Sequence, residues 1–126
     1  MSRTVTKAYA ENDMAASWDT QALPCDTLRR GRAILTADVV VDSFVGNLLV
    51  QVSNQPAPDQ SRRQDYTPPE DTFVTTKTVA VSLAGPGDAV DTGSFDLTCT
   101  YVRFAYERTS GEGAATLRVV LTGDEE

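Results

Sequence analysis

Apolar and polar residues alternate along several short segments of the chain. In the segment 45–55 the apolar positions that share one face are Leu48, Val50 and Val52. The segment 73–83 repeats this pattern with Val79, Val81 and Leu83. A period of two is typical of a half-buried antiparallel strand. The segment 30–44 is rich in β-branched residues, which also favours a strand, and Gly46–Asn47 is expected to turn the chain between it and the next strand.

The segment 100–123 predicts two further strands joined by the glycine-bearing sequence SGEG. The apolar residues of its two halves are expected to stack across the pair, and they are Val102, Phe104 and Tyr106 in the first half and Leu117, Val119 and Leu121 in the second. The opposite faces carry charged residues that are expected to lie outside the core, namely Arg103, Glu107 and Arg118. This segment is therefore predicted to be the closing hairpin of the fold.

One segment, 55–72, breaks the alternation. It holds four of the six prolines, many polar residues and almost no apolar ones. Loops longer than about 12–15 residues are uncommon in compact domains and are often functional or disordered. We expect a long exposed loop here, with a second loop over 84–94.

These patterns together predict an all-β protein with about seven or eight short strands and no helix of note. Such a pattern is typical of an antiparallel β-sandwich, including the jelly-roll type. The 126 residues suffice for one domain. We expect an N-terminal strand or arm over 1–14, a single β-sandwich domain over 15–123 with the loop insert 55–72, and an acidic tail over 124–126.

The net charge is −7, from 18 acidic and 11 basic residues. An acidic chain is a poor ligand for the phosphate backbone of nucleic acids and for anionic membrane surfaces, so neither is expected as a partner. No apolar run approaches the ~20 residues that cross a bilayer, and the polar N-terminus lacks the apolar centre of a signal peptide. We therefore expect synthesis in a cytosol, where the two cysteines, Cys25 and Cys99, stay as thiols; a disulfide is the less favoured alternative.

Candidate chemistry is sparse. The chain contains no histidine, which excludes Ser-His-Asp and Cys-His catalysis, and two cysteines are too few for a structural zinc site. The acidic residues are scattered and show no pair spaced for glycoside hydrolysis. The acidic positions of the two loops, which are Glu70, Asp71, Asp88 and Asp91, lack the dense alternation of a strong calcium motif. The sequence predicts a protein that is not an enzyme and uses no cofactor and no metal.

Contact with a partner is the remaining role for the unusual residues. Trp18 is expected to pack in the core, with a sugar-stacking platform as the alternative. Loop arginines and a loop tyrosine are typical of protein interfaces. The predicted contact residues lie in the loop and in the N-terminal arm, and they are Arg62, Arg63, Tyr66, Pro68, Pro69, Arg3 and Tyr9.

Three ordered motifs carry a resemblance to a known group of proteins. The residues concerned are Trp18; Gly46, Val50, Val52, Ser53 and Asn54; and Tyr101, Val102, Arg103, Tyr106, Thr109, Ser110, Gly111 and Gly113. They span most of 17–123, and in this order they resemble small jelly-roll or galactose-binding-like structural proteins of tailed bacteriophages. The chain departs from that pattern after Asn54, where the proline-rich insert replaces a quick turn.

The resemblance implies a virion component that is assembled in the host cytoplasm. A capsid decoration (cement) protein is the first expectation, and a neck, tail or fibre component is the second. The expected partners are the major capsid protein or other virion proteins. Because small sandwiches expose sheet edges, we also expect a homo-oligomer, with a trimer favoured. A carbohydrate-binding module that holds a surface glycan during host attachment is the alternative.

Overall fold

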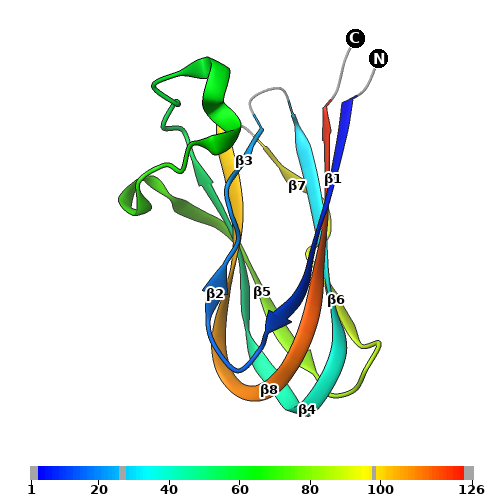
Figure 1. The fold of residues 1–126 in the computed structure, drawn as a ribbon. Coiled ribbons are helices and arrows are strands. Elements are labelled where there is room, and N and C mark those ends of the chain that lie inside the picture. The colour runs from blue at the N-terminus through cyan, green and yellow to red at the C-terminus, as the bar shows by residue number, and fades with distance from the viewer. Residues whose placement is uncertain (1–2, 26–27, 98, 124–126) are drawn as a thin grey trace.

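Two long strands, β4 (Arg30–Ser53) and β8 (Tyr101–Gly123), run side by side through the whole molecule and belong to both of its layers (Figure 1). The computed structural model describes residues 3–25, 28–97 and 99–123. The other strands are β1 (Arg3–Asp13), β2 (Trp18–Asp19), β3 (Leu23–Pro24), β5 (Val74–Leu83), β6 (Ala89–Asp91) and β7 (Phe95–Asp96). Two 3₁₀ helices, η1 (Gln60–Asp65) and η2 (Glu70–Thr72), lie between β4 and β5.

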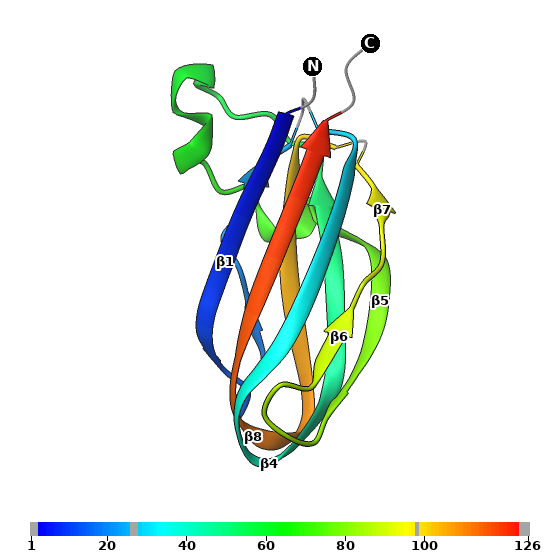
Figure 2. The same cartoon turned by 90° about the vertical axis from the view of Figure 1, so that its right-hand side faces the viewer.

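Each long strand contributes one half to each layer. In the first layer, here called sheet I, residues 30–40 of β4 pair with residues 113–122 of β8, and β1, β6 and β7 add to this pair. In the second layer, sheet II, residues 45–53 of β4 pair with residues 101–110 of β8, and β2, β3 and β5 complete the layer. All these pairings are antiparallel, and the two layers face each other (Figures 1 and 2).

The two strands change sheets at a shared bend. The buried positions of β4 are the odd-numbered 31–37 before the bend. After the bend they are the even-numbered 44–50, together with Leu49 and Ser53. The register with β8 shifts several times between Ala37 and Gly46, as β-bulges require. Bulges at such a corner let one strand keep its apolar side inward in both layers of a sandwich.

Two glycines of β8 make the bend sterically possible. Gly111 and Gly113 have φ angles of +103° and +152°, which L side chains rarely adopt. A Cβ at Gly111 would lie 2.3 Å from the Cα of Phe44, and one at Gly113 would lie 2.1 Å from the carbonyl oxygen of Val39. The backbones of β4 and β8 can therefore approach closely only because both positions lack a side chain.

One apolar core fills the space between the sheets. Six apolar residues of the last segment, from Val102 to Leu121, were predicted to face the core, and each of them is at most 1% exposed. The rings of Phe95 and Phe104 lie 6.1 Å apart, and Trp18 packs on this core with its ring 5.7 Å from that of Tyr106. This packing agrees with the expected core role of Trp18.

The structure confirms the predicted all-β antiparallel sandwich with a long proline-rich loop, and eight strands are present in the described residues. Two local predictions were wrong. Gly46–Asn47 forms no turn, because both residues lie within the continuous strand β4. The segment 101–123 is one bent strand and no hairpin, so its two apolar triplets lie in different sheets.

The start of β1 and the end of β8 lie together at one end of the sandwich (Figure 1). There Arg3, at the start of β1, pairs with Gly123 at the end of β8. The expected acidic tail over 124–126 lies outside the described residues. No helix in the described part of the chain is long and apolar enough to cross a membrane.

Candidate functional site

The proline-rich segment 55–72 projects from the sandwich near β3 and the start of β8 (Figure 1). Most of its residues are exposed, as predicted, but Ala57 and Pro68 are buried. The segment also contains η1 and η2, which the sequence analysis did not expect. It is therefore a projection with its own local structure. We call it the projecting segment.

Helix η1 begins with a side-chain cap. The Asp59 carboxylate accepts hydrogen bonds from the backbone N–H of Ser61 at 3.0 Å and from the Ser61 hydroxyl at 2.7 Å. These bonds favour the ionised carboxylate, so they lower the pKa of Asp59. An aspartate at this position satisfies an N–H that the short helix leaves unpaired.

A small apolar cluster fastens η1 to sheet II. Tyr101, which is 1% exposed, donates a hydrogen bond of 2.7 Å from its hydroxyl to the carbonyl oxygen of Arg63. The rings of Tyr66 and Tyr101 lie 5.8 Å apart. Ala22 and Ala57 are buried in the same cluster, which is separate from the main core. The base of the projecting segment is thus held by both a hydrogen bond and apolar packing.

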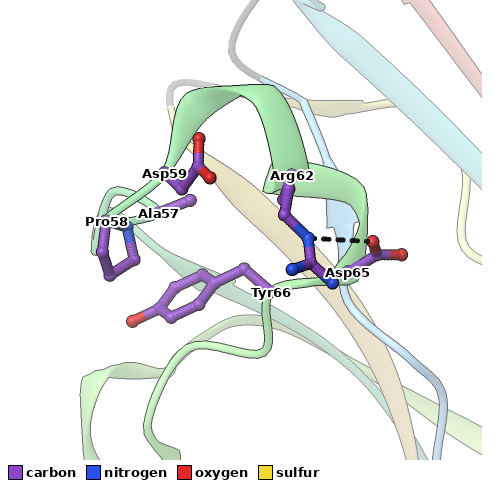
Figure 3. A pocket seen from close by; sticks show the side chains of 6 residues that line it. All are labelled: Ala57, Pro58, Asp59, Arg62, Asp65 and Tyr66. Atoms are coloured by element: carbon purple, nitrogen blue, oxygen red, sulfur yellow. Dashed lines mark ion pairs between the residues drawn. The ribbon is translucent and has the colours of Figure 1, made fainter.

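A hollow of about 240 Å³ opens on the projecting segment itself (Figure 3). Its lining residues are Ala57, Pro58, Asp59, Arg62, Asp65 and Tyr66. Arg62 and Asp65 form an ion pair of 3.9 Å, with side chains 73% and 74% exposed. Proline and tyrosine rings beside exposed charges offer a partner both apolar contact and hydrogen bonds.

Helix η2 is held by Arg103 on the outer face of sheet II. The guanidinium donates a hydrogen bond of 2.8 Å to the side-chain oxygen of Gln51 and pairs with Glu70 of η2. Its carbon atom lies 4.0 Å from the centre of the Phe73 ring, a cation–π distance, and Asp19 of β2 lies 3.7 Å from the guanidinium. Arg103 therefore links its own strand, β8, to β2, β4 and η2.

A second hollow, of about 330 Å³, lies beside this cluster. Its lining residues are Ser17, Trp18, Asp19, Leu49, Gln51, Glu70, Arg103, Ala105, Tyr106 and Glu107. Three of these are acidic and one is basic. The hollow therefore combines hydrogen-bonding groups with an excess of negative charge.

The structure brings only some of the predicted contact residues together, and these lie on the projecting segment. Arg62 and Tyr66 line one hollow, and Arg63 contributes its carbonyl to the bond with Tyr101. Pro69 is exposed and directly precedes η2, whereas Pro68 is buried. A contact role for the buried ring of Pro68 is therefore not supported.

The remaining predicted residues, Arg3 and Tyr9, lie on β1 at the edge of sheet I, apart from the projecting segment (Figure 1). Tyr9 packs against the main core. Burial of its phenol raises the pKa of Tyr9. The N-terminal segment is thus a paired strand, and its tyrosine serves the core.

The sequence analysis missed Arg103. It was expected to lie outside, yet only 9% of the residue is exposed because η2 and Phe73 cover it. Alternation along β8 correctly assigns Arg103 to the face opposite the core. No local signal showed that a segment more than thirty positions away would fold over it.

Among the residues that the structure describes, no three acidic or cysteine side chains gather as a metal site would require. The predicted loop acids Asp88 and Asp91 bind nearby backbone, and Asp91, which lies in β6, also forms an ion pair with Arg32 of β4. Asp88 accepts hydrogen bonds from the backbone N–H groups of Ala84 and Gly85, and Asp91 accepts one from Gly93. These contacts are those of ordinary turn aspartates.

No family model and no curated protein matches the chain. Solved structures do match. The PBSX exported protein XepA has a TM-score of 0.58 at 15% identity over 100% of this chain. This chain spans only 38% of the length of XepA.

Two further structures are similar. A protein of the Bacillus endospore appendages, which are disulfide-linked pili, has a TM-score of 0.52 at 10% identity, covering 100% of this chain and 88% of its own. The SPBc2 prophage-derived protein YomS has a TM-score of 0.51 at 10% identity, covering 96% of both chains. At such identities the likeness shows a shared fold.

Proposed function

We propose that this protein is a non-enzymatic structural component of a tailed-phage virion and that it binds its partner through the projecting segment. A capsid decoration protein is the form we favour, with the major capsid protein as partner. The similar structures include a PBSX exported protein and a prophage-derived protein, which supports a phage origin for the fold.

The observation that carries the proposal is the ordered state of the projecting segment. The exposed Arg62 lies on η1 and the exposed Pro69 directly precedes η2. Tyr101 holds η1 in place and Arg103 holds η2. A segment that is ordered before binding loses less conformational entropy when it meets its partner. If many associated copies bind to one capsid at once, multivalency strengthens their attachment further.

Open strand edges support self-association. Within the described residues, β1 pairs only with β8 and β5 pairs only with β4, so each leaves one edge unpaired. Pairing between copies would cover these edges. We propose a homo-oligomer, with a trimer favoured, and light scattering after size-exclusion chromatography measures its mass directly.

The first experiment mixes the purified protein with undecorated capsids of the phage that encodes it. Quantitative mass spectrometry then counts bound copies per particle. We expect hundreds of copies and increased resistance of the shell to heat. Absence of capsid binding, or only a few copies per complete virion, would replace the decoration role with one in the neck, tail or fibre.

A matched pair of variants tests the projecting segment. The double variant Arg62→Ala/Tyr66→Ala should weaken capsid binding about tenfold or more, since aromatic and arginine residues dominate most interfaces. Arg118→Ala, an exposed arginine on sheet I, is the control and should bind as the wild type does. Equal binding by all three proteins would place the contact elsewhere on the surface.

The hollow beside Arg103 favours a second candidate function, binding of a surface glycan. Its carboxylates, Gln51 and the guanidinium could bind sugar hydroxyls. Trp18 also lines this hollow, but its ring packs against Tyr106 and is partly buried on the core, so only part of it is open to a sugar. Calorimetric titration with host glycans tests this role. Saturable binding that is lost in Gln51→Ala and kept in Arg62→Ala would favour it.

A further inference from the structure

The two cysteines, which are 74 positions apart in the sequence, meet at one end of sheet II. Cys25 directly follows β3, and Cys99 lies two residues before β8. Their Sγ atoms are 3.0 Å apart. Cys25 is fully buried and Cys99 is 9% exposed. The backbone N–H of Cys25 donates a hydrogen bond of 2.8 Å to the carbonyl oxygen of Thr100, which fixes the two chain segments relative to each other.

We propose that Cys25 and Cys99 are a reversible redox pair that closes to an intramolecular disulfide when the protein meets a disulfide oxidant such as oxidised glutathione. A disulfide requires the sulfur atoms to approach to about 2.05 Å. From 3.0 Å this needs an approach of about 1 Å. The pair is a covalent site within the sandwich, and it does not depend on the virion role.

The chemistry is a thiol–disulfide exchange in two steps. Cys99, the less buried of the two residues, loses its proton and attacks one sulfur of oxidised glutathione. This forms a mixed disulfide and releases one glutathione thiolate. Cys25 then loses its proton and attacks the Cys99 sulfur, which releases the second glutathione. The two protons pass to the two glutathione thiolates, so two protein thiols are oxidised and one glutathione disulfide is reduced to two thiols.

The bond would stabilise the end of the sandwich that carries the projecting segment. It would join β3 to the chain entering β8, and Pro24 of β3 pairs with Tyr101, the residue that anchors η1. A cross-link across 74 positions strongly restricts the unfolded chain. The oxidised protein should therefore melt on the order of 10 °C above the reduced protein. In a reducing cytosol the pair stays as thiols, and it closes where oxidants prevail.

The test uses the purified full chain. The reduced protein is equilibrated with oxidised glutathione and quenched with acid. It is then unfolded in guanidinium chloride and alkylated at neutral pH, where thiols react, and the intact mass is measured. We expect a mass lower by two hydrogen atoms and no alkylated cysteine, a single monomer band on a non-reducing gel, and the higher melting temperature. Dithiothreitol should restore two alkylated thiols and the lower melting temperature.

Three outcomes would overturn the proposal. They are two alkylated thiols after equilibration, a stable glutathione adduct on one cysteine, and a disulfide-linked dimer. Cys99→Ser is the matched control, and its melting temperature should not change between oxidising and reducing buffer. If that variant does not fold, the mass measurement on the wild-type protein still decides the question.

Discussion

Replacing Arg103 with alanine tests whether the projecting segment is part of the fold or merely an attached loop. The change removes the hydrogen bond to Gln51, the ion pairs with Glu70 and Asp19, and the cation–π contact with Phe73. It leaves the core untouched, since Arg103 points away from it. The sandwich should therefore still fold, but less stably.

The size of the effect follows from how exposed each partner is. The Glu70 and Asp19 side chains are 74% and 53% exposed, so solvent screens them and each pair contributes about 0.5 kcal/mol. The hydrogen bond to Gln51 contributes about 1 kcal/mol and the contact with Phe73 about 0.5–1 kcal/mol. We expect Arg103→Ala to lower the free energy of unfolding by about 2–3 kcal/mol.

Two measurements check this expectation. Urea denaturation gives the free energy of unfolding, and hydrogen exchange read by mass spectrometry follows the backbone over 69–74. Exchange should become faster in this stretch and stay unchanged in sheet I. Arg118→Ala, on the exposed face of sheet I, is the matched control and should stay within about 0.5 kcal/mol of the wild type. Arg103→Lys keeps the charge without the planar fork and should restore only part of the stability.

The reasoning would be refuted by an Arg103→Ala protein within about 0.5 kcal/mol of the wild type and with unchanged exchange over 69–74. That result would mean that η2 holds its place without Arg103. A protein that fails to fold at all would also refute it, because a group on the outer face would then be essential to the core.

Three further changes give distinct outcomes. Gly113→Ala should cost at least about 3 kcal/mol or prevent folding, since its Cβ would lie 2.1 Å from a backbone oxygen at a positive φ, and thermal denaturation measures this. Tyr101→Phe, which removes the hydrogen bond to Arg63, should cost about 1 kcal/mol and increase proteolysis within 55–72. The Arg32 guanidinium holds the pKa of Asp91 at about 2, so the stability from this pair should persist above about pH 4 and be lost as the pH falls from about 4 to 2. In an NMR titration, Arg32→Ala should return that pKa towards its ordinary value.

The sequence analysis identified which residues face the core but misplaced where the chain turns. In β8, the residues of the main core are even-numbered from Val102 to Tyr106 and odd-numbered from Ala115 to Leu121. Such a switch from even to odd core positions at a glycine-bearing sequence has two physical explanations, a hairpin turn or a bulged bend. Periodicity cannot separate them, because both reverse the alternation. The answer lies in the partner strand β4, which bends at the same place.

The candidate site was predictable only in part. Proline content and polarity correctly marked 55–72 as a long and largely exposed loop, and Arg62 is exposed there, whereas Tyr66 is half-buried against Tyr101. The contacts that order it depend on residues far away in sequence, such as the bond from Tyr101 to the Arg63 carbonyl. The meeting of Cys25 and Cys99 is equally non-local, because it requires β3 and β8 to pair first.

Tyr101 and Arg103 explain how the projecting segment can vary without harm to the fold. They lie two positions apart on β8, so their side chains share the outer face of sheet II. Tyr101 holds η1 through the Arg63 carbonyl, and Arg103 holds η2 through Glu70. Because the hydroxyl of Tyr101 binds a backbone carbonyl, this hydrogen bond does not depend on which side chains η1 exposes. Substitutions at Arg62 should therefore change partner binding with little loss of stability, whereas substitutions at Tyr101 should lower both together.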